Sequence, residues 1–303
     1  MHGCSTDAPP PLDGTGCQDS HGVMLVLSWN INAIRGIESG RLEGVAAVIR
    51  RLEPDVALFQ EVGWKKGQDA SILRMLEQVG LGNIHYSGDH AANKKLYGCV
   101  VASRHPMRPH DSGWAKAAPR PQLLARATVV VDGTEVDCIS AHIPNGSGNG
   151  WNKPKTFEAL ADALRNAPDM PRVLGGDFNE PREVRPNGQI VTFGERVGVD
   201  GSVTCRGKKT GKCGETHPRR RWDAAVRAIF AGETSHGLRR AHAVVHGVGA
   251  AATTHVVKRQ SRFFDHLFVS RHFEVEEADY DHGVREQGVS DHSAAWVRVR
   301  SRE

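Results

Sequence analysis

Acidic, amide and imidazole side chains lie where several apolar runs of this chain begin or end. Asp177 and Asn179 follow one such run, and Asn30 follows another. Glu61 comes after a third run, and His292 precedes the last one. Carboxylate and amide oxygens are ligands that Mg²⁺ prefers, and an imidazole can serve a charged transition state. The combination predicts hydrolysis of a phosphate ester with help from a hard divalent metal.

Asp177 and Asn179 are two positions apart in the sequence Gly-Gly-Asp-Phe-Asn. If the preceding strand continues through them, their side chains share a face, because alternate residues of a strand point to the same side. The carboxylate would then orient or deprotonate an attacking water that the amide holds. Glycine, aspartate and asparagine are also turn residues, so this motif alone leaves a turn and a catalytic pair both open.

Two histidines near the end of the chain follow an aspartate, in Asp265-His266 and Asp291-His292. A carboxylate partner fixes the tautomer of a histidine and favours its imidazolium form, which suits contact with a phosphate oxygen. We predict that Asp265 is the partner of His292. His142 ends a strand-like run and is a further candidate, whereas most of the 16 histidines are expected to be ordinary surface or capping residues.

Glu61 is the predicted metal ligand. It follows an apolar run, where it could equally be a solvated acid. One carboxylate, together with the amide of Asn30 and water, suits a weakly held Mg²⁺. We therefore expect Glu61 and Asn30 to lie close together.

The elements that would position these residues alternate at first between strands and helices. Residues 23–29 and 55–60 are apolar runs that predict strands, and residues 41–52 and 70–79 have the spacing of helices. Further strands are predicted at residues 98–103, 123–131, 135–142, 172–175, 264–270, 273–278 and 294–299, and further helices at 157–164 and 222–230. Hairpins mixed with crossover helices predict an α/β fold of two mixed β-sheets packed face to face, with helices on the outside.

The 303 residues are predicted to hold one catalytic domain at residues 23–303, because the candidate residues are spread along the chain and only one fold would gather them. Residues 1–22 are rich in Pro, Gly and Ser and lack the core of a secretion signal, so we predict a disordered tail. No apolar stretch is long enough to cross a bilayer. We expect a cytoplasmic protein with no membrane partner and no obligate protein partner.

Basic residues concentrate in one segment, although the net charge is only +4. Residues 206–221 hold seven Lys or Arg against one Glu, and they include Arg219, Arg220 and Arg221. Such a segment attracts a polyanion, or it is a solvated loop that binds nothing, and the sequence leaves both open. Cys205 and Cys213 flank part of it and could pair, but the expected cytoplasmic setting favours reduced thiols.

Six short motifs, taken in order, resemble the endonuclease/exonuclease/phosphatase superfamily. They are Ser28-Trp29-Asn30-Ile31-Asn32-Ala33-Ile34-Arg35, Phe59-Gln60-Glu61, His142-Ile143-Pro144-Asn145-Gly146, Gly176-Asp177-Phe178-Asn179, Phe264-Asp265-His266 and Ser290-Asp291-His292. Each motif is short, but six in the family's order make chance agreement improbable. They span nearly all of the chain after the tail.

The resemblance implies a two-sheet sandwich with a divalent metal at one edge, usually Mg²⁺, with Mn²⁺ as an alternative ion. The metal would be held chiefly by Glu61 with support from Asn30, and Asp291 would sit on the metal side. Asp177 and Asn179 would position the water nucleophile.

The resemblance also implies how the phosphate would be contacted. Asp265 would orient His292 against the scissile phosphate, and His142 would contact a phosphate oxygen. Whether His292 is a base or an electrostatic stabiliser is left open by the sequence.

Two stretches look most like exonuclease III and the abasic-site endonucleases: Asn30-Ile31-Asn32 with Arg35, and Ile143-Pro144-Asn145. This likeness implies that Asn32, Arg35 and Asn145 bind the substrate. His142 stands where those enzymes usually have tyrosine, so the resemblance predicts the superfamily's chemistry rather than abasic-site specificity.

The leading hypothesis is a Mg²⁺-dependent nuclease that cuts DNA by direct attack of water, with Arg219, Arg220 and Arg221 gripping backbone phosphates. A second hypothesis keeps the chemistry but changes the substrate to RNA, a phosphorylated small molecule or a lipid head group. A third is a catalytically silent nucleic-acid-binding protein. It is disfavoured because every position expected to carry the reaction holds a competent residue.

Overall fold

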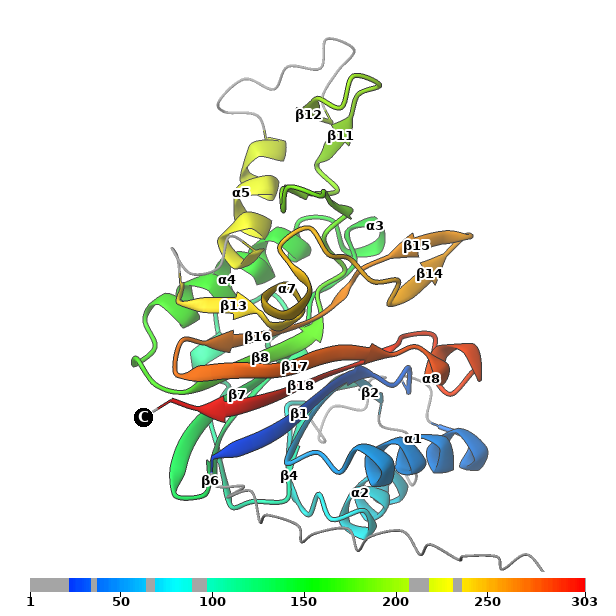
Figure 1. Ribbon diagram of the computed structural model, residues 1–303, viewed down its shortest axis with the longest axis vertical. Coiled ribbons are helices and arrows are strands. Elements are labelled where there is room, and N and C mark those ends of the chain that lie inside the picture. The colour runs from blue at the N-terminus through cyan, green and yellow to red at the C-terminus, as the bar shows by residue number, and fades with distance from the viewer. Residues whose placement is uncertain are drawn as a thin grey trace, which may run out of the picture.

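Two six-stranded β-sheets pack face to face and carry helices on their outer faces (Figure 1). This computed structural model describes residues 22–33, 37–63, 69–88, 97–206, 218–230 and 236–302. The arrangement confirms the predicted fold class. The predicted N-terminal tail lies outside the described residues except for Gly22, and Arg35 and Cys213 lie outside them too.

The first sheet has the strand order β17-β18-β1-β2-β4-β3. Its strands are β1 (Val23–Asn30), β2 (Val56–Gly63), β3 (Asn83–Tyr86), β4 (Tyr97–Ser103), β17 (Phe273–Asp281) and β18 (Ala294–Ser301). The second sheet has the order β13-β16-β8-β7-β6-β5. Its strands are β5 (Met107–Pro109), β6 (Leu124–Val131), β7 (Thr134–His142), β8 (Arg172–Asp177), β13 (Leu238–Arg240) and β16 (Asp265–Ser270).

The central strand β1 shows why its sequence is a continuous apolar run. Met24 and Val26 lie in the core between the two sheets, together with residues of the second sheet. Leu27 and Trp29 lie in a second core, with residues of the two helices near the N-terminus. A strand buried on both faces needs apolar residues at successive positions rather than at alternate ones.

Within the described residues, four longer helices cover the sheets. They are α1 (Ser39–Leu52), α2 (Asp69–Gln78), α4 (Asn152–Arg165) and α5 (Pro218–Phe230). Helices α1 and α2 contribute to the core on the outer side of the first sheet, whereas α4 and α5 lie beside the second sheet (Figure 1). Helix α1 ends at a left-handed Glu53, whose N–H donates to Ile49 O, and Pro54 follows.

The other elements in the described part of the chain are short. They are the strands β9 (Glu183–Val184), β10 (Ile190–Val191), β11 (Glu195–Val197), β12 (Val203–Cys205), β14 (His255–Val257) and β15 (Gln260–Arg262), the helices α3 (Gly146–Asn149), α7 (Ala241–His246) and α8 (Gly283–Glu286), and the 3₁₀ turns η1 (Ser112–Ala115) and η2 (Pro121–Leu123). None of these was predicted, because runs of two to six residues give no readable period.

Cys205 is disulfide-bonded, which differs from the reduced state predicted for it. Cys99 and Cys138 are buried free thiols in the strands where they were expected. No helix in the described part of the chain is long and apolar enough to cross a membrane.

Candidate active site

Three neighbouring strands of the second sheet bring His142, Asp177 and Asp265 to one edge. Strands β7 and β8 are parallel, and their last residues, His142 and Asp177, are directly paired. Strand β16 is antiparallel to β8, so its first residue, Asp265, pairs with Asp177. Residues adjacent in register have neighbouring side chains. The sheet therefore sets these three groups side by side.

The first sheet contributes Asn30 and Glu61 to the same place. Strand β1 ends at Asn30, which pairs with Gln60 of the parallel strand β2. The β2–β4 ladder shifts register between Phe59 and Val62, and Glu61 has a φ of 54°. This left-handed conformation costs a non-glycine residue about 1 kcal/mol or more. This irregularity within β2 brings Glu61 Oε1 to 3.6 Å from His142 Nε2 of the other sheet.

Asp177 is the buried hub of the site. Its Oδ2 accepts a hydrogen bond from Asn30 Nδ2 at 3.1 Å, and its Oδ1 accepts from the backbone N–H of Asn179 at 2.9 Å. Asn179 Nδ2 donates to Ile143 O at 3.0 Å and lies 3.4 Å from Asp177 Oδ2. Strand β8 stops at Asp177, and Asn179 has a φ of 49°. Of the two arrangements that the sequence left open, the structure therefore has the turn, and the two side chains meet through a side-chain-to-backbone hydrogen bond rather than through strand alternation.

His292 lies between two carboxylates. Its Nδ1 donates to Asp265, with 3.0 Å to Oδ2 and 3.1 Å to Oδ1, and its Nε2 is 3.8 Å from Asp177 Oδ2. Asp265 is itself anchored through its backbone, because Tyr280 Oη donates to Asp265 O at 3.0 Å and Asp265 N donates to Thr254 Oγ1 at 3.2 Å. The carboxylate of Asp265 thus fixes the ring so that Nε2 points toward Asp177.

These contacts shift the titration of the site. Burial alone would lower the pKa of His292, but the charges of Asp265 and Asp177 outweigh burial and raise it to about 10. Burial alone would raise the pKa of Asp177, yet His292, His142 and the hydrogen bonds lower it. Burial raises the pKa of Glu61, His142 opposes this, and the nearby charge of Asp177 adds to the rise. His292 is therefore an imidazolium at neutral pH and Asp177 a carboxylate.

Other predicted site residues lie around this centre. Asp291 is exposed, and it groups with His255 and His292 as potential metal ligands. Asn32 N donates to Asn30 Oδ1 at 3.0 Å, so Asn32 holds the amide of Asn30 in place. Asn145 is exposed and caps α3, since its Oδ1 accepts from Gly148 N at 2.9 Å.

The three arginines of the basic segment begin α5, away from the strand ends that form the site (Figure 1). Arg221 makes two hydrogen bonds of 2.7 Å to Glu158 of α4. The guanidinium of Arg219 lies 5.5 Å from the ring of Trp222. Lys208, Lys209 and Lys212, which also belong to the predicted basic loop, lie outside the described residues.

Two sets of residues at the site were not predicted. His255 on β14 stacks on His292, with ring centroids 4.1 Å apart and planes at 12°, and its Nδ1 is 2.9 Å from Asp291 O. Buried Lys153 of α4 donates to Asn179 O at 2.6 Å and pairs with Glu180 at 3.0 Å. Neither carries a sequence signal, because His255 lies in a three-residue strand and Lys153 in the unexpected first turn of α4.

Comparison of the sequence with models of protein families identifies one family. A model of the endonuclease/exonuclease/phosphatase family matches residues 27–292. The chain belongs to that family. No curated protein sequence gives a match.

Solved structures of the endonuclease/exonuclease/phosphatase type share the fold at low sequence identity. A member from Beutenbergia cavernae is 18% identical, with a TM-score of 0.59 over 93% of this chain and 72% of that chain. A 3′ phosphatase from Neisseria, bound to a product DNA hairpin, is 22% identical, with a TM-score of 0.60 over 90% and 98% of the two chains. An AP endonuclease from Archaeoglobus fulgidus is 19% identical, with a TM-score of 0.61 over 90% and 98%. At these identities the likeness shows the fold.

The family implies a divalent metal, and the residues of this site fit one. Glu61 is a carboxylate whose pKa is raised by burial, with His142 opposing and Asp177 adding repulsion, so a bound cation would stabilise its ionised form. Asn30 Oδ1 accepts from Asn32 N and keeps a second lone pair for a ligand. A carboxylate and an amide oxygen form a hard donor set that suits Mg²⁺ or Mn²⁺.

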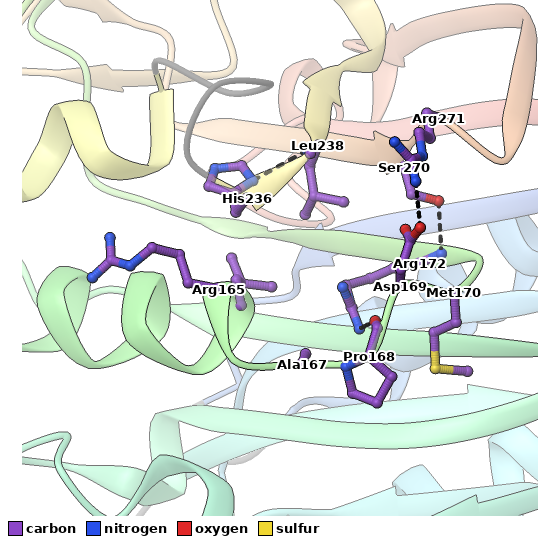
Figure 2. A pocket seen from close by; sticks show the side chains of 12 residues that line it. Arg165, Ala167, Pro168, Asp169, Met170, Arg172, His236, Leu238, Ser270 and Arg271 are labelled. Carbon is purple, nitrogen blue, oxygen red and sulfur yellow. Dashed lines mark hydrogen bonds and ion pairs between the residues drawn. The ribbon is translucent and has the colours of Figure 1, made fainter.

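A well-formed pocket lies elsewhere on the molecule. It has a volume of about 290 Å³ and is lined by Arg172 at the start of β8 and Ser270 at the end of β16 (Figure 2). The candidate site is at the opposite ends of these two strands. Asp169 and Arg271 pair within the pocket, and Ser270 Oγ accepts from Arg172 N at 3.0 Å. The polar groups of this pocket therefore stabilise the local structure by bonding to one another.

Proposed function

We propose that this protein is a divalent-metal-dependent phosphodiesterase that hydrolyses DNA by direct attack of water. One observation carries the proposal: Asp177 Oδ2 lies 3.6 Å from His142 Nε2 and 3.8 Å from His292 Nε2, while Glu61 lies 3.6 Å from the same His142 nitrogen. These separations exceed hydrogen-bond lengths. A water or a phosphate oxygen among them would meet donors and acceptors from both sheets.

The proposed roles follow from the charges. Asp177, held by Asn179 and Asn30, orients the attacking water and receives its proton. As the new P–O bond forms, the P–O bond to the sugar breaks, and the departing oxygen takes a proton from solvent. His292 is an imidazolium positioned by Asp265, so it offers a hydrogen bond and a positive charge to the phosphate as negative charge develops on its oxygens. We thus infer an electrostatic stabiliser rather than a base. His142 donates to a second phosphate oxygen.

Glu61 and Asn30 are the residues proposed to hold the metal, with Asp291 as a further ligand from the His292 side. When bound, the ion supplies a Lewis acid that neutralises charge on a phosphate oxygen. Asn32 supports this role indirectly, because its backbone fixes the amide of Asn30.

DNA as the substrate is supported by two basic surfaces, of which only the first lies beside the site. Hairpin β14–β15 projects from the body (Figure 1), and it carries the exposed Lys258 and Arg259 at its turn. His255 at its base stacks on His292, so the hairpin adjoins the reacting groups. Arg219 and Arg220 of α5 offer a second basic surface. The Neisseria phosphatase with the same fold was solved with a DNA product.

The test is a substrate panel with metal control. Labelled duplex DNA, intact or with an abasic site, single-stranded DNA, 3′-phosphorylated DNA, RNA and a soluble phosphate ester are assayed with Mg²⁺, Mn²⁺ and chelator. We expect DNA cleavage that needs the metal, and a Glu61→Gln variant that needs far higher Mg²⁺ for the same rate. Faster cleavage of RNA or of the small ester than of DNA would show that DNA is not the preferred substrate. DNA binding without hydrolysis of any substrate would refute the proposal that the protein is an enzyme.

A further inference from the structure

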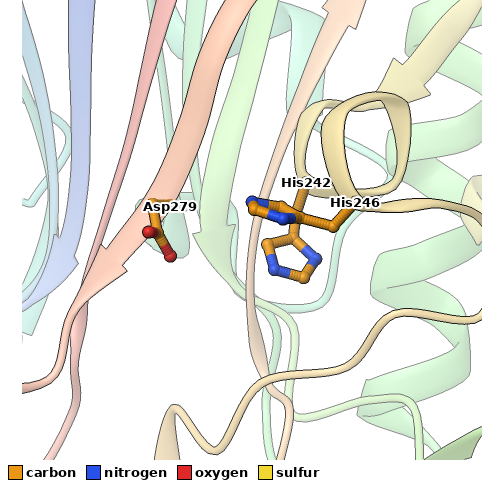
Figure 3. A group of neighbouring side chains, drawn as sticks. All are labelled: His242, His246 and Asp279. Carbon is orange, nitrogen blue, oxygen red and sulfur yellow. The ribbon is translucent and has the colours of Figure 1, made fainter.

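A group of three potential ligands lies outside the candidate active site (Figure 3). His242 and His246 are four residues apart on α7, and Asp279 belongs to β17. The two imidazole rings have centroids 4.4 Å apart. One ligand atom of each side chain lies within 4.8 Å of the others. Residues at i and i+4 face the same side of a helix, so the spacing itself aims both rings at one point.

The hydrogen bonds leave lone pairs for a ligand. His246 Nε2 is 2.8 Å from Ala278 O, and a carbonyl only accepts, so Nε2 carries the hydrogen and Nδ1 of the neutral ring has the lone pair. A backbone carbonyl in this role orients many metal-bound histidines. His242 Nδ1 is buried and has no hydrogen-bond partner among the described residues.

We propose that His242, His246 and Asp279 bind a first-row transition metal ion of the Zn²⁺ type, at a site separate from the catalytic one. Two imidazoles and one carboxylate are the donor set of such ions, whereas Mg²⁺ prefers oxygen ligands. His246 and Asp279 are exposed, so water can supply the fourth ligand of a tetrahedral site. Zinc–ligand bonds are about 2 Å long, so the ligand atoms of a tetrahedral site lie roughly 3–4 Å apart. Metal binding therefore requires the three side chains to close in from separations of up to 4.8 Å.

The metal would join parts of the two sheets. Helix α7 follows directly on β13 of the second sheet, whereas β17 is the edge strand of the first. The ring of His242 also lies 5.2 Å from that of Tyr280, whose hydroxyl donates to Asp265 O. A bound ion would therefore clamp α7 onto β17 and brace the strand that carries Asp265. The nearby Arg240 is a positive charge that a metal has to overcome.

The experiment measures Zn²⁺ binding to the full-length protein after chelation, by calorimetry and by the absorption spectrum of Co²⁺. It is done in a Glu61→Gln background to suppress metal at the catalytic centre. We expect one Zn²⁺ per chain, and a rise in Tm on adding Zn²⁺. His246→Gln and Asp279→Asn should each raise the Kd for Zn²⁺ at least 10–100-fold. Replacing a residue that only hydrogen-bonds to a metal ligand already lowers metal affinity by that factor, and replacing the ligand itself should lower it at least as much. Both side chains are exposed, so these variants should fold.

His272→Gln, at a partly buried histidine outside the group, is the matched control and should keep the wild-type Kd. Unchanged Zn²⁺ affinity in both His246→Gln and Asp279→Asn would overturn the proposal. So would the absence of any Zn²⁺ binding in the Glu61→Gln background, because the ion would then belong to the catalytic centre. Neither result bears on DNA cleavage by the wild-type chain, which is tested separately with Mg²⁺.

Discussion

Asp177 and Asp265 are buried carboxylates that face the same histidine, yet their pKa values shift in opposite directions. Burial raises the pKa of Asp265, opposed by His292, and Asp177 adds to the rise. Asp177 has a second imidazole nearby and hydrogen bonds from Asn179 and Asn30, which together more than cancel its burial. When the surroundings of two carboxylates move their pKa values apart in this way, the two groups usually have different roles in a site. In the proposed mechanism, Asp177 stays ionised beside the reacting atoms, and Asp265 positions His292.

At the residue scale, Asp177→Asn and His292→Gln should each lower kcat by about 10²–10⁴-fold, the usual effect of losing a group that acts in the transition state.

Asp265→Asn should lower kcat less and leave KM nearly unchanged. It should also move the alkaline limb of the pH profile to lower pH, because Asp265 helps to raise the pKa of His292. Steady-state kinetics from pH 6 to 10 measure this, with the exposed Asp200→Asn as control. An unmoved alkaline limb would contradict the positioning role.

At the scale of elements, two glycines of strand β8 allow neighbouring segments to approach its backbone closely. A Cβ on Gly176 would lie 1.8 Å from Ala141 O of β7, and one on Gly175 would meet side chains from both sheets at 2.8 Å. The two glycines therefore allow the close packing that places Asp177 beside His142. Their sequence favours a turn equally well, since a strand glycine and a turn glycine look alike without the neighbouring strand.

Gly176→Ala should destabilise the protein by roughly 1–3 kcal/mol, because a backbone carbonyl cannot move aside as a flexible side chain can. Urea unfolding measures the free energy of unfolding. Gly82→Ala is the control, since nothing lies within 4 Å of its added Cβ. Equal stability of the two variants would mean that β7 and β8 do not approach each other this closely.

The basic elements can be separated by salt dependence. Each phosphate contact contributes about −0.9 to the slope of log Kobs against log salt for duplex DNA. We expect the double substitution of Lys258 and Arg259 by Ser to make the slope less steep, by up to about 2. Substituting Arg219 and Arg220 by Ser tests the α5 surface in the same way. Arg221→Ser should change the slope less, because Arg221 already pairs with Glu158. Filter binding at several salt concentrations, with chelator present, decides between the surfaces.

At the scale of the whole molecule, buried histidines should limit stability on both sides of neutrality. Burial lowers the pKa of His266 to about 3, so its contribution is present above pH 6.5 and is lost as pH falls toward 3. His292 has a raised pKa, so its contribution is present below pH 6.5 and is lost as pH rises toward 10. Both signs follow from which state of the protein binds the proton more tightly.

The free energy of unfolding should therefore be highest near pH 6.5 and decline on both sides. Chemical unfolding across this pH range, in the presence of chelator, measures it. His292→Gln should flatten the alkaline decline and leave the acid decline in place. If His292→Gln and the wild type decline alike above pH 7, the ion pair of His292 with Asp265 is not a determinant of stability.

The sequence by itself determined the main strands, the longer helices and the residue types that could do the chemistry. Long apolar runs and helical spacing depend on burial, which a single chain records directly, so β1, α1 and the hairpin β6–β7 were predictable to within two residues. Tertiary structure decided how these residues meet. The approach of Glu61 to His142 depends on a register shift in β2, and the stacking of His255 on His292 depends on a three-residue strand. Such features arise from contacts between distant segments, and no local pattern in the chain encodes them.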